Sequence, residues 1–411
     1  MKLKKEIKDI DLMLLLSMIF LIIMGLVAVT SASFPTAKKY NLNSFHFLIR
    51  QGAFLILGII SMILIIRVPR GVIYKNITWL FILSVILILL LWTPLGYNKN
   101  GQSRWLDFKV IPLKFQPSDL LKLTSIVFLS KYLSRNIYTL REPKNFLIAV
   151  AIMGISVGPI MIKDFSTAVV IGVSLFAILL AAGINKKQFL FLVVLGIALI
   201  FVILKDPENE FRLKRIFGFV SDSTDYQSAA LYQARQSLYA FALGGYSGVG
   251  LFRSRQKYTN LPEAYTDFIF SVIAEEFGFI GTFIVILLFI IYIYRGYMIA
   301  FKATNYFDKF TAIGMTTYIG IQAFFNMGVC AKLLPVTGIT LPFISYGGTA
   351  LVMAIVSTAI LLKISKEGTI WDTFYLVEVL EDTFIQHLPL EKKLKNKTRK
   401  QKYFMLVKKI L

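Results

Sequence analysis

The sequence LPEAYTDFIF, Leu261–Phe270, places Asp267 directly before the long apolar run Phe268–Tyr294. That run carries Glu275 and Glu276 in its first turns. A helix that crosses a bilayer needs about 17–25 mainly apolar residues. Carboxylates at the boundary of such a helix, or one or two turns inside it, are unfavourable unless they serve a function. The stretch therefore predicts a membrane helix whose N-terminal end carries functional carboxylates.

The composition of the whole chain agrees with this interpretation. Of 411 residues, 56% are hydrophobic and 35 are Phe, which no ordinary soluble domain could bury in one core. We predict an all-α, polytopic integral membrane protein with ten transmembrane helices and a long outer loop between helices 7 and 8. The predicted spans are Leu12–Thr30, Phe45–Ile66, Asn76–Trp92, Ser118–Leu133, Phe146–Ile162, Thr167–Ile184, Phe189–Leu204, Phe268–Tyr294, Thr311–Val329 and Thr349–Ile364.

The distribution of Lys and Arg predicts the orientation. If the N-terminus is cytoplasmic, the short inner segments carry roughly twice as many of these residues as the short outer loops, as the positive-inside rule requires. Ten spans then place both termini in the cytoplasm. Residues 1–365 would form the membrane domain and residues 366–411 a cytoplasmic basic tail, whose Lys-rich half could lie on anionic membrane lipids or remain solvated.

Several cations fall on the predicted outer side, against the general bias. Half of the Lys and Arg residues of the short outer loops lie in residues 93–117, and Arg104 is one of them. These cations indicate an anionic partner such as phosphate, or else pairing with Asp107 or lipid headgroups. Lys122 lies one turn inside an apolar helix, so it either snorkels to the interface or holds an acidic partner or an anionic ligand. Arg255 and Lys257 are also close in sequence to Asp267.

Other kinds of site are excluded by residue counts. The single cysteine, Cys330, excludes an internal disulfide, and the two histidines exclude a His-rich metal site and a Ser-His-Asp triad. Acid–base chemistry must therefore rest on carboxylates. The net charge of +22 is spread over loops and the tail, so we expect no nucleic-acid partner. The glycine-rich sequence at 244–250 lacks the Gly-Lys-Ser/Thr ending of a nucleotide loop and predicts a flexible or tightly turned loop.

Taken together, these segments resemble the SEDS family of cell-wall polymerases, which includes FtsW, RodA and SpoVE. The resemblance covers about residues 11–365. The matching segments are Asn100–Trp105, Gln116–Asp119 with Lys122, Asp164 with Thr167 and Ala168, Ser254–Lys257, Pro262–Phe270 continuing through Glu275–Gly278, and Gly338–Gly348. The sequence departs from the family where Tyr265 replaces the usual His, Asp119 the usual Glu, and Lys332 a small residue. The Pro-Asp-Leu-Gly string usual in the family is also altered, to Lys163–Ser166.

The resemblance implies a peptidoglycan glycosyltransferase that joins lipid II units at the outer face of the bacterial plasma membrane and releases undecaprenyl pyrophosphate. Asp267 would be the catalytic base for the 4-hydroxyl of the acceptor sugar. The implied substrate-binding residues are Arg104, Lys122, Arg255, Lys257, Glu276 and Ser345. The implied supporting residues are Asp119, Asp164, Glu263 and Glu275.

The motifs are most similar to the division and sporulation branch, FtsW and SpoVE, whose members work with a class B penicillin-binding protein that crosslinks the glycan. Two other functions fit ten helices with buried charges: a lipid II flippase, and a non-catalytic scaffold for the penicillin-binding protein. No cofactor is certain from the sequence, and a divalent cation, Mg or Mn, is left open.

Overall fold

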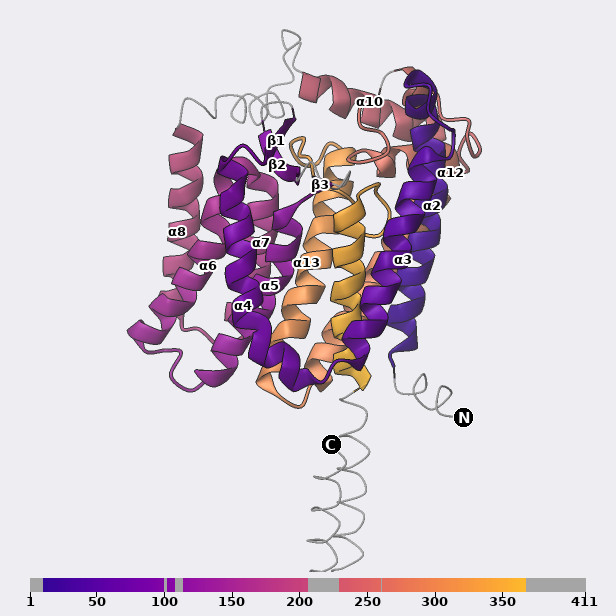
Figure 1. Cartoon of the computed structure of the whole chain (residues 1–411). Coiled ribbons are helices and arrows are strands. Elements are labelled where there is room, and N and C mark those ends of the chain that lie inside the picture. Colours follow the sequence, from indigo (N-terminus) through magenta and orange to yellow (C-terminus); the bar gives the residue numbers. More distant parts are fainter. Residues whose placement is uncertain (1–9, 100–101, 108–113, 206–228, 260, 367–411) are drawn as a thin grey trace, which may run out of the picture.

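The long helices of the protein run side by side as one bundle (Figure 1). The computed structural model describes residues 10–99, 102–107, 114–205, 229–259 and 261–366. The bundle contains α2 (Leu12–Lys39), α3 (His46–Arg67), α4 (Arg70–Leu89), α5 (Pro117–Arg135), α6 (Pro143–Lys163), α7 (Phe165–Ala181), α8 (Lys186–Lys205), α12 (Ile269–Lys302), α13 (Tyr306–Cys330) and the final described helix, Gly348–Lys366. Each predicted span overlaps one of these helices. The predicted basic tail lies outside the described residues, apart from Lys366.

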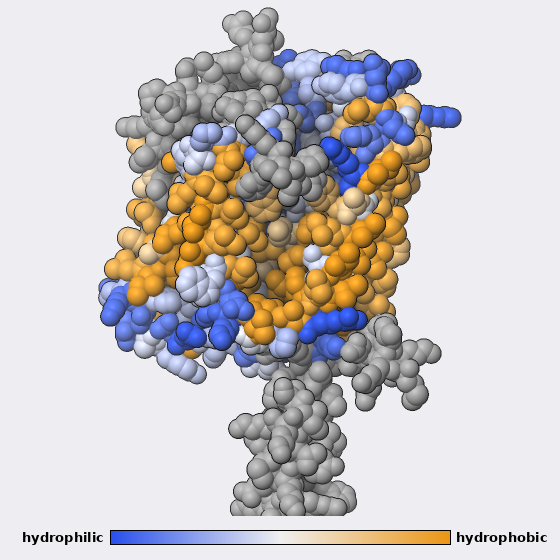
Figure 2. Space-filling view, viewed as in Figure 1, coloured by the Kyte–Doolittle hydropathy of each residue, from blue (hydrophilic) through white to orange (hydrophobic). Residues whose placement is uncertain are grey.

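Apolar side chains cover the middle of the bundle, between two polar ends (Figure 2). Six helices of the described residues are long and apolar enough to cross a membrane: Leu12–Lys39, His46–Arg67, Gly71–Trp92, Pro143–Lys163, Ile269–Lys302 and Gly348–Lys366. Many of their outward side chains are exposed, for example those of Ile56 and Phe283. Exposed apolar side chains at this density match a lipid environment, so the protein is a multi-pass membrane protein.

Two helices in the middle of the bundle are more polar, and their packing explains why. Helices α5 and α13 pack against each other, and both also contact α7. Buried positions occur all along α5 and include the hydroxyls of Ser125 and Ser130 and the amine of Lys122. A helix surrounded by protein can carry polar groups that a lipid-facing helix cannot, because neighbouring helices supply their hydrogen-bond partners.

A small antiparallel sheet covers one end of the bundle and was not predicted by the all-α assignment. It consists of β1 (Gly96–Lys99), β2 (Gln102–Asp107) and β3 (Lys114–Phe115), in the order β1-β2-β3. Leu106 pairs with Gly96 on one side and Phe115 on the other, and its side chain is fully buried. The sheet forms because this buried leucine and the ladder hydrogen bonds hold an otherwise polar loop against the bundle. We call this end, which also carries α10, the sheet end.

Helix α10 (Ala229–Gly244) lies across the sheet end (Figure 1), and the short helix α11 (Gln256–Thr259) follows it. Leu231, Leu238 and Tyr239 recur at helical spacing, which predicts an amphipathic helix over residues 227–243. The structure confirms this helix for its described part. Between α10 and α11 the glycine loop 244–250 packs against α12 where that helix is interrupted at Gly278, which has φ 64° and ψ −160°.

The glycine loop replaces the hydrogen bonds that α12 loses at this kink. Val249 N–H donates to the carbonyl of Glu275 at 2.9 Å, and Phe279 N–H donates to the carbonyl of Gly245 at 2.9 Å. A side chain at Gly278 would need a left-handed backbone and would place Cβ 2.4 Å from the nitrogen of Gly248. Of the two predicted alternatives, a flexible loop and a tightly turned loop, the second is confirmed. The loop holds the turn of α12 that carries Glu275 and Glu276.

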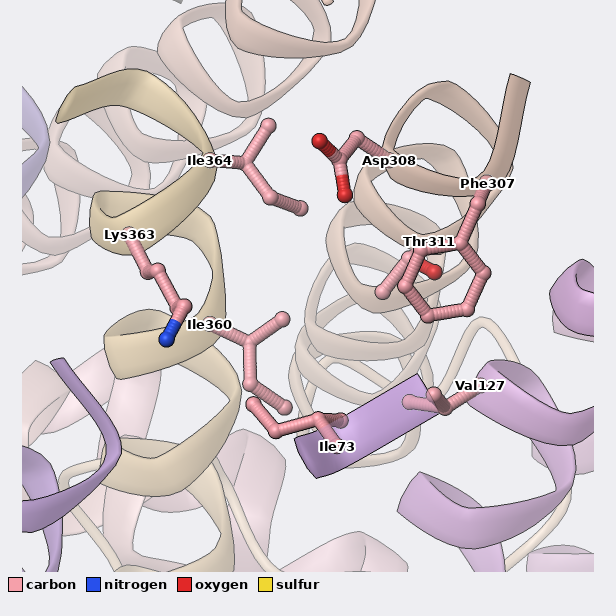
Figure 3. A pocket seen from close by; sticks show the side chains of 8 residues that line it. All are labelled: Ile73, Val127, Phe307, Asp308, Thr311, Ile360, Lys363 and Ile364. Atoms are coloured by element: carbon pink, nitrogen blue, oxygen red, sulfur yellow. The ribbon is translucent and has the colours of Figure 1, made fainter. Parts of the chain in front are cut away.

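The opposite end, which we call the tail end, is closed by a different set of contacts. The Asp11 carboxylate caps α2 by accepting the N–H of Leu14, and it accepts two guanidinium hydrogen bonds from Arg295 of α12. The backbone N–H of Asp11 donates to Oγ of Ser365. A small pocket at this end lies between α4, α5, α13 and the final described helix (Figure 3). Asp308, near the start of α13, lines this pocket, and Asn326 lies near the other end of the same helix, at the sheet end. The eighteen positions that separate them, at 1.5 Å per residue, put the pocket about 27 Å from the sheet end.

Candidate active site

Asp267 is presented at the sheet end by a strained turn immediately before α12. Glu263 has a positive φ of 52°, and its carbonyl accepts the N–H of Asp267 at 3.1 Å and of Thr266 at 3.2 Å. Left-handed backbone at a residue other than glycine is unfavourable and concentrates at functional sites. The hydroxyl of Thr266 also donates to the Glu263 carboxylate at 3.1 Å. Glu263, predicted as a supporting residue, thus shapes the turn that presents Asp267.

The segment from Gly338 to Tyr346 folds over this turn. Ser345 Oγ donates to the carbonyl of Thr266 at 2.5 Å and accepts the N–H of Leu341 at 2.8 Å. Tyr346 N–H donates to the carbonyl of Tyr265 at 3.0 Å. The Pro- and Gly-rich sequence therefore forms an irregular segment packed inside the protein. Ser345, predicted to bind substrate, uses its hydroxyl to join the two segments.

Arg104 and Asp267 converge on Gly338. A Cβ atom placed on Gly338 would lie 2.7 Å from Nη1 of Arg104 and 3.5 Å from Oδ2 of Asp267. Any side chain larger than hydrogen would therefore clash with the guanidinium and displace it from this place beside Asp267. Arg104 comes from β2, Asp267 from the turn before α12, and Gly338 from the segment after α13. The sheet that was absent from the sequence prediction is what carries Arg104 to this point.

Asp164 orients Arg104 from the other side. Its carboxylate lies 3.5 Å from Nη2 of Arg104 and caps α7 by accepting hydrogen bonds from the Thr167 N–H and hydroxyl. The Nε of Arg104 is buried and has no protein partner, and the buried hydroxyl of Thr337, beside Gly338, has none either. Buried polar groups are normally satisfied, so these two groups indicate a place where a ligand completes the hydrogen bonding.

Lys122 does not snorkel to an interface. Its amine lies 2.9 Å from the Asp119 carboxylate, the two side chains are only 5% and 2% exposed, and Gln322 Oε1 accepts from the same amine at 3.3 Å. Asp119 also accepts the hydroxyl of Thr349 at 2.7 Å. The alternative in which Lys122 holds an acidic partner is confirmed, with Asp119 as the partner.

Lys257 and Glu276 form a second buried pair. The side chains are 0% and 1% exposed, and the Lys257 amine also donates to Ser31 Oγ of α2 at 2.6 Å. Ser31 Oγ lies 2.7 Å from Oε1 of Glu276. Both residues were predicted to bind substrate. The structure places them in a buried network with each other and with Ser31 of α2.

Glu275 acts at the start of α11. Its carboxylate accepts the hydroxyl of Ser254 at 2.5 Å and the N–H of Arg255 at 2.6 Å, so it holds the beginning of this short helix. The side chain of Arg255 is exposed. Glu275 is thus a supporting residue for the segment that carries Arg255 and Lys257.

Tyr265 is a poor candidate for a base. Its ring contacts Phe47 and Tyr346 at centroid distances of 4.9 and 5.7 Å. Burial, and then the charge of Glu263, raise the pKa of Tyr265 to about 12. Its hydroxyl therefore stays protonated at neutral pH, so a base at this end must be one of the carboxylates. Within the described ranges, no group of three or more His, Cys, Asp or Glu side chains is arranged to hold a metal ion.

Several polar residues at this end were missed by the sequence analysis. They are Ser31 of α2, Gln51 of α3, Gln322 and Asn326 of α13, and Thr337. Four of them interrupt apolar helices, which is the one signal available in the sequence. That signal does not tell which carbonyl or carboxylate each side chain meets, because the partners are distant in the chain.

Fold and site together define a multi-pass membrane protein with a carboxylate and an arginine converging at one end of its bundle. A family model described as "Cell cycle protein", covering FtsW, RodA and SpoVE, matches residues 11–370. The chain belongs to this family, as its motifs predicted.

Named relatives agree with the family assignment. The chain is 36% identical to a probable peptidoglycan glycosyltransferase FtsW of Idiomarina loihiensis over 87% of each protein. It is 37% identical to the stage V sporulation protein E of Bacillus subtilis, over 87% of this chain and 97% of that one.

Solved structures share the fold. One is from a study of the structural coordination of polymerization and crosslinking by a peptidoglycan synthase complex, with a TM-score of 0.72, 24% identity, and coverage of 87% of this chain and 98% of that one. Another is the rod shape determining protein RodA of Thermus thermophilus, with a TM-score of 0.65, 24% identity, and coverage of 87% and 97%. The overall arrangement of the helices is therefore that of this family.

Proposed function

We propose that this protein is a peptidoglycan glycosyltransferase that polymerises lipid II at the outer face of the bacterial plasma membrane. The observation that carries the proposal is the convergence of the Asp267 carboxylate and the Arg104 guanidinium on Gly338. A base and a cation side by side suit a reaction in which a hydroxyl loses a proton while a diphosphate leaves. The relatives that bear the name peptidoglycan glycosyltransferase support the same reaction.

In this reaction Asp267 accepts the proton from the 4-hydroxyl of the acceptor sugar. The freed oxygen attacks the anomeric carbon of the donor, and a new glycosidic C–O bond forms as the bond to the diphosphate breaks. Undecaprenyl pyrophosphate takes the electron pair of the broken bond. The charge that develops on its bridging oxygen is where a preorganised cation stabilises the transition state most.

Arg104 is the proposed ligand of the diphosphate. Its buried Nε lacks a protein partner, and Asp164 holds the far side of the guanidinium. The fork of an arginine fits phosphate oxygens in a bidentate manner. Lys122 would add positive charge nearby while held by Asp119, and the exposed Arg255 would meet the substrate at the rim.

The orientation and the partner complete the proposal. With both termini in the cytoplasm and ten spans, the sheet end faces outward, where lipid II is polymerised. The segments between α8 and α12 then form the long outer loop. A class B penicillin-binding protein is the proposed partner, supported by the fold shared with a chain from a peptidoglycan synthase complex.

The decisive experiment supplies labelled lipid II to the purified protein in liposomes. Polymer that a muramidase digests to disaccharide units is the expected result. Movement of label across the bilayer without polymer would establish a flippase instead. Neither polymer nor movement, in the presence and absence of the penicillin-binding protein, would favour a scaffold.

A further inference from the structure

Two amide side chains on α13 connect the parts of the candidate site. Gln322 and Asn326 lie four residues apart, so they project from the same face of the helix. Both are almost fully buried, at 3% and 1% exposed. An amide buried in a membrane helix is unfavourable unless its polar atoms find partners. Their partners are groups of the site, apart from the thiol of Cys330, which donates to Oδ1 of Asn326 at 3.9 Å.

Gln322 joins α5 to the segment after α13. Its Oε1 accepts a hydrogen bond from the Lys122 amine at 3.3 Å, and its Nε2 donates to the carbonyl of Thr340 at 3.0 Å. The amide therefore holds the cation and the segment at a fixed separation. Lys122 cannot move toward or away from Thr340 without breaking one of the two contacts.

Asn326 joins the Asp267 turn to the same segment. Its Nδ2 donates to the carbonyl of Asp267 at 2.8 Å and to the carbonyl of Ile339 at 2.7 Å. Ile339 follows Gly338, the residue on which the Asp267 and Arg104 side chains converge. The Asn326 amide thus holds the backbone of Asp267 against the backbone next to Gly338, which the Arg104 side chain also approaches.

We infer that Gln322 and Asn326 are positioning residues, which set the place of the Asp267 carboxylate relative to the cations Arg104 and Lys122. The inference rests on the proposed function and extends it to residues that touch no substrate. The α13 backbone acts as a rigid rod between them, since neighbouring positions on one face of a helix keep a constant spacing. Catalytic groups displaced by about 1 Å can lose on the order of 100-fold in rate.

The test compares three single variants of the purified protein in lipid II polymerisation. Asn326→Leu removes both donated hydrogen bonds and is expected to lower kcat about 10- to 100-fold, with KM for lipid II changed by less than about twofold. Gln322→Leu is expected to lower kcat by a smaller factor, because Lys122 keeps its contact with Asp119 at 2.9 Å. Thr316→Val is the matched control: a buried α13 hydroxyl without a partner, expected to leave kcat unchanged.

Thermal midpoints separate loss of position from loss of folding. All variants are assayed at a temperature at which each is folded. If Asn326→Leu does not fold, Asn326→Asp takes its place, because it keeps the side-chain volume, and its protonated carboxyl can donate one of the two bonds. That variant is expected to lose less kcat than the leucine variant.

Wild-type kcat in a folded Asn326 variant would overturn the inference, as would a fall that appears only in KM. The Asp267→Asn variant distinguishes this failure from a failure of the proposed function. If Asp267→Asn is inactive while Asn326→Leu is fully active, only the positioning role is wrong. If Asp267→Asn is as active as the wild type, Asp267 is not the catalytic base and the proposed mechanism is wrong.

Discussion

The sheet end contains two buried lysine–carboxylate pairs that look alike in chemistry and differ in their surroundings. Lys122 and Asp119 lie on one helix, three residues apart, and reach the site through Gln322 and Thr340. Lys257 and Glu276 come from separate segments and meet Ser31 of α2. The first pair is connected to the segment after α13, and the second joins α11 to α12 and α2.

This difference shows that burial of a charge does not by itself identify a functional site. Removal of one member of a buried ion pair strongly destabilises the fold, whereas replacement of both members by apolar residues is often neutral. The second pair should behave in this structural manner. The first pair should respond differently, because its cation has a further role in the proposed reaction.

The largest effect on stability is expected from Lys257→Met. The change leaves the Glu276 carboxylate, 1% exposed, without its cation, and should reduce the free energy of unfolding by about 3–5 kcal/mol. Thermal unfolding in detergent measures the loss. The double variant Lys257→Met/Glu276→Leu should recover both the midpoint and the polymerisation activity. If the double variant regains the thermal midpoint but not the polymerisation activity, Lys257 binds substrate, as the resemblance implied.

Lys122→Met should act mainly on catalysis. Asp119 stays at the N-terminal end of α5 and keeps the Thr349 hydroxyl, so the free energy of unfolding should fall by only about 1–2 kcal/mol. Polymerisation should fall about 100-fold, because a preorganised charge near the leaving group is lost. The double variant Lys122→Met/Asp119→Leu should regain stability and remain inactive. Wild-type polymerisation by Lys122→Met would remove this lysine from the mechanism.

A third pair, at the tail end, provides the smallest expected effect. Arg295 and Asp11 join α12 to α2, but the arginine side chain is 29% exposed, so solvent screens the pair. Arg295→Met should lower the free energy of unfolding by about 0.5–1 kcal/mol and leave polymerisation unchanged. A large loss of activity in a folded Arg295→Met protein would show coupling between the two ends of the bundle.

The sequence predicted the parts of this account that depend on local pattern. Apolar runs located the helices. Asp267 stood out as a carboxylate at the start of an apolar span, Arg104 as a cation on the predicted outer side, and Asp164 through the family motif that contains it. An acidic partner was one of three stated alternatives for Lys122, beside snorkelling and an anionic ligand. Asp119 is that partner because a spacing of three residues brings both side chains to one face of α5.

Other parts depend on contacts that no local pattern encodes. Lys257 meets Ser31 across 226 positions of sequence, and Asn326 meets Asp267 across 59. The three-stranded sheet was missed because its strands are short and polar, and become stable only when Leu106 is buried against the bundle. The kink at Gly278 was missed because the glycine loop 244–250 that satisfies it is distant from Gly278 in the sequence.

The most direct test of the central claim is the polymerisation rate of the Asp267→Asn protein. The substitution keeps the size of the side chain and removes its ability to accept a proton. With labelled lipid II, the account predicts at least about 100-fold less polymer than the wild type at an unchanged thermal midpoint. The control Glu142→Gln, at the residue that precedes α6 at the tail end, should polymerise normally. Wild-type amounts of polymer from Asp267→Asn would contradict the assignment of Asp267 as the catalytic base.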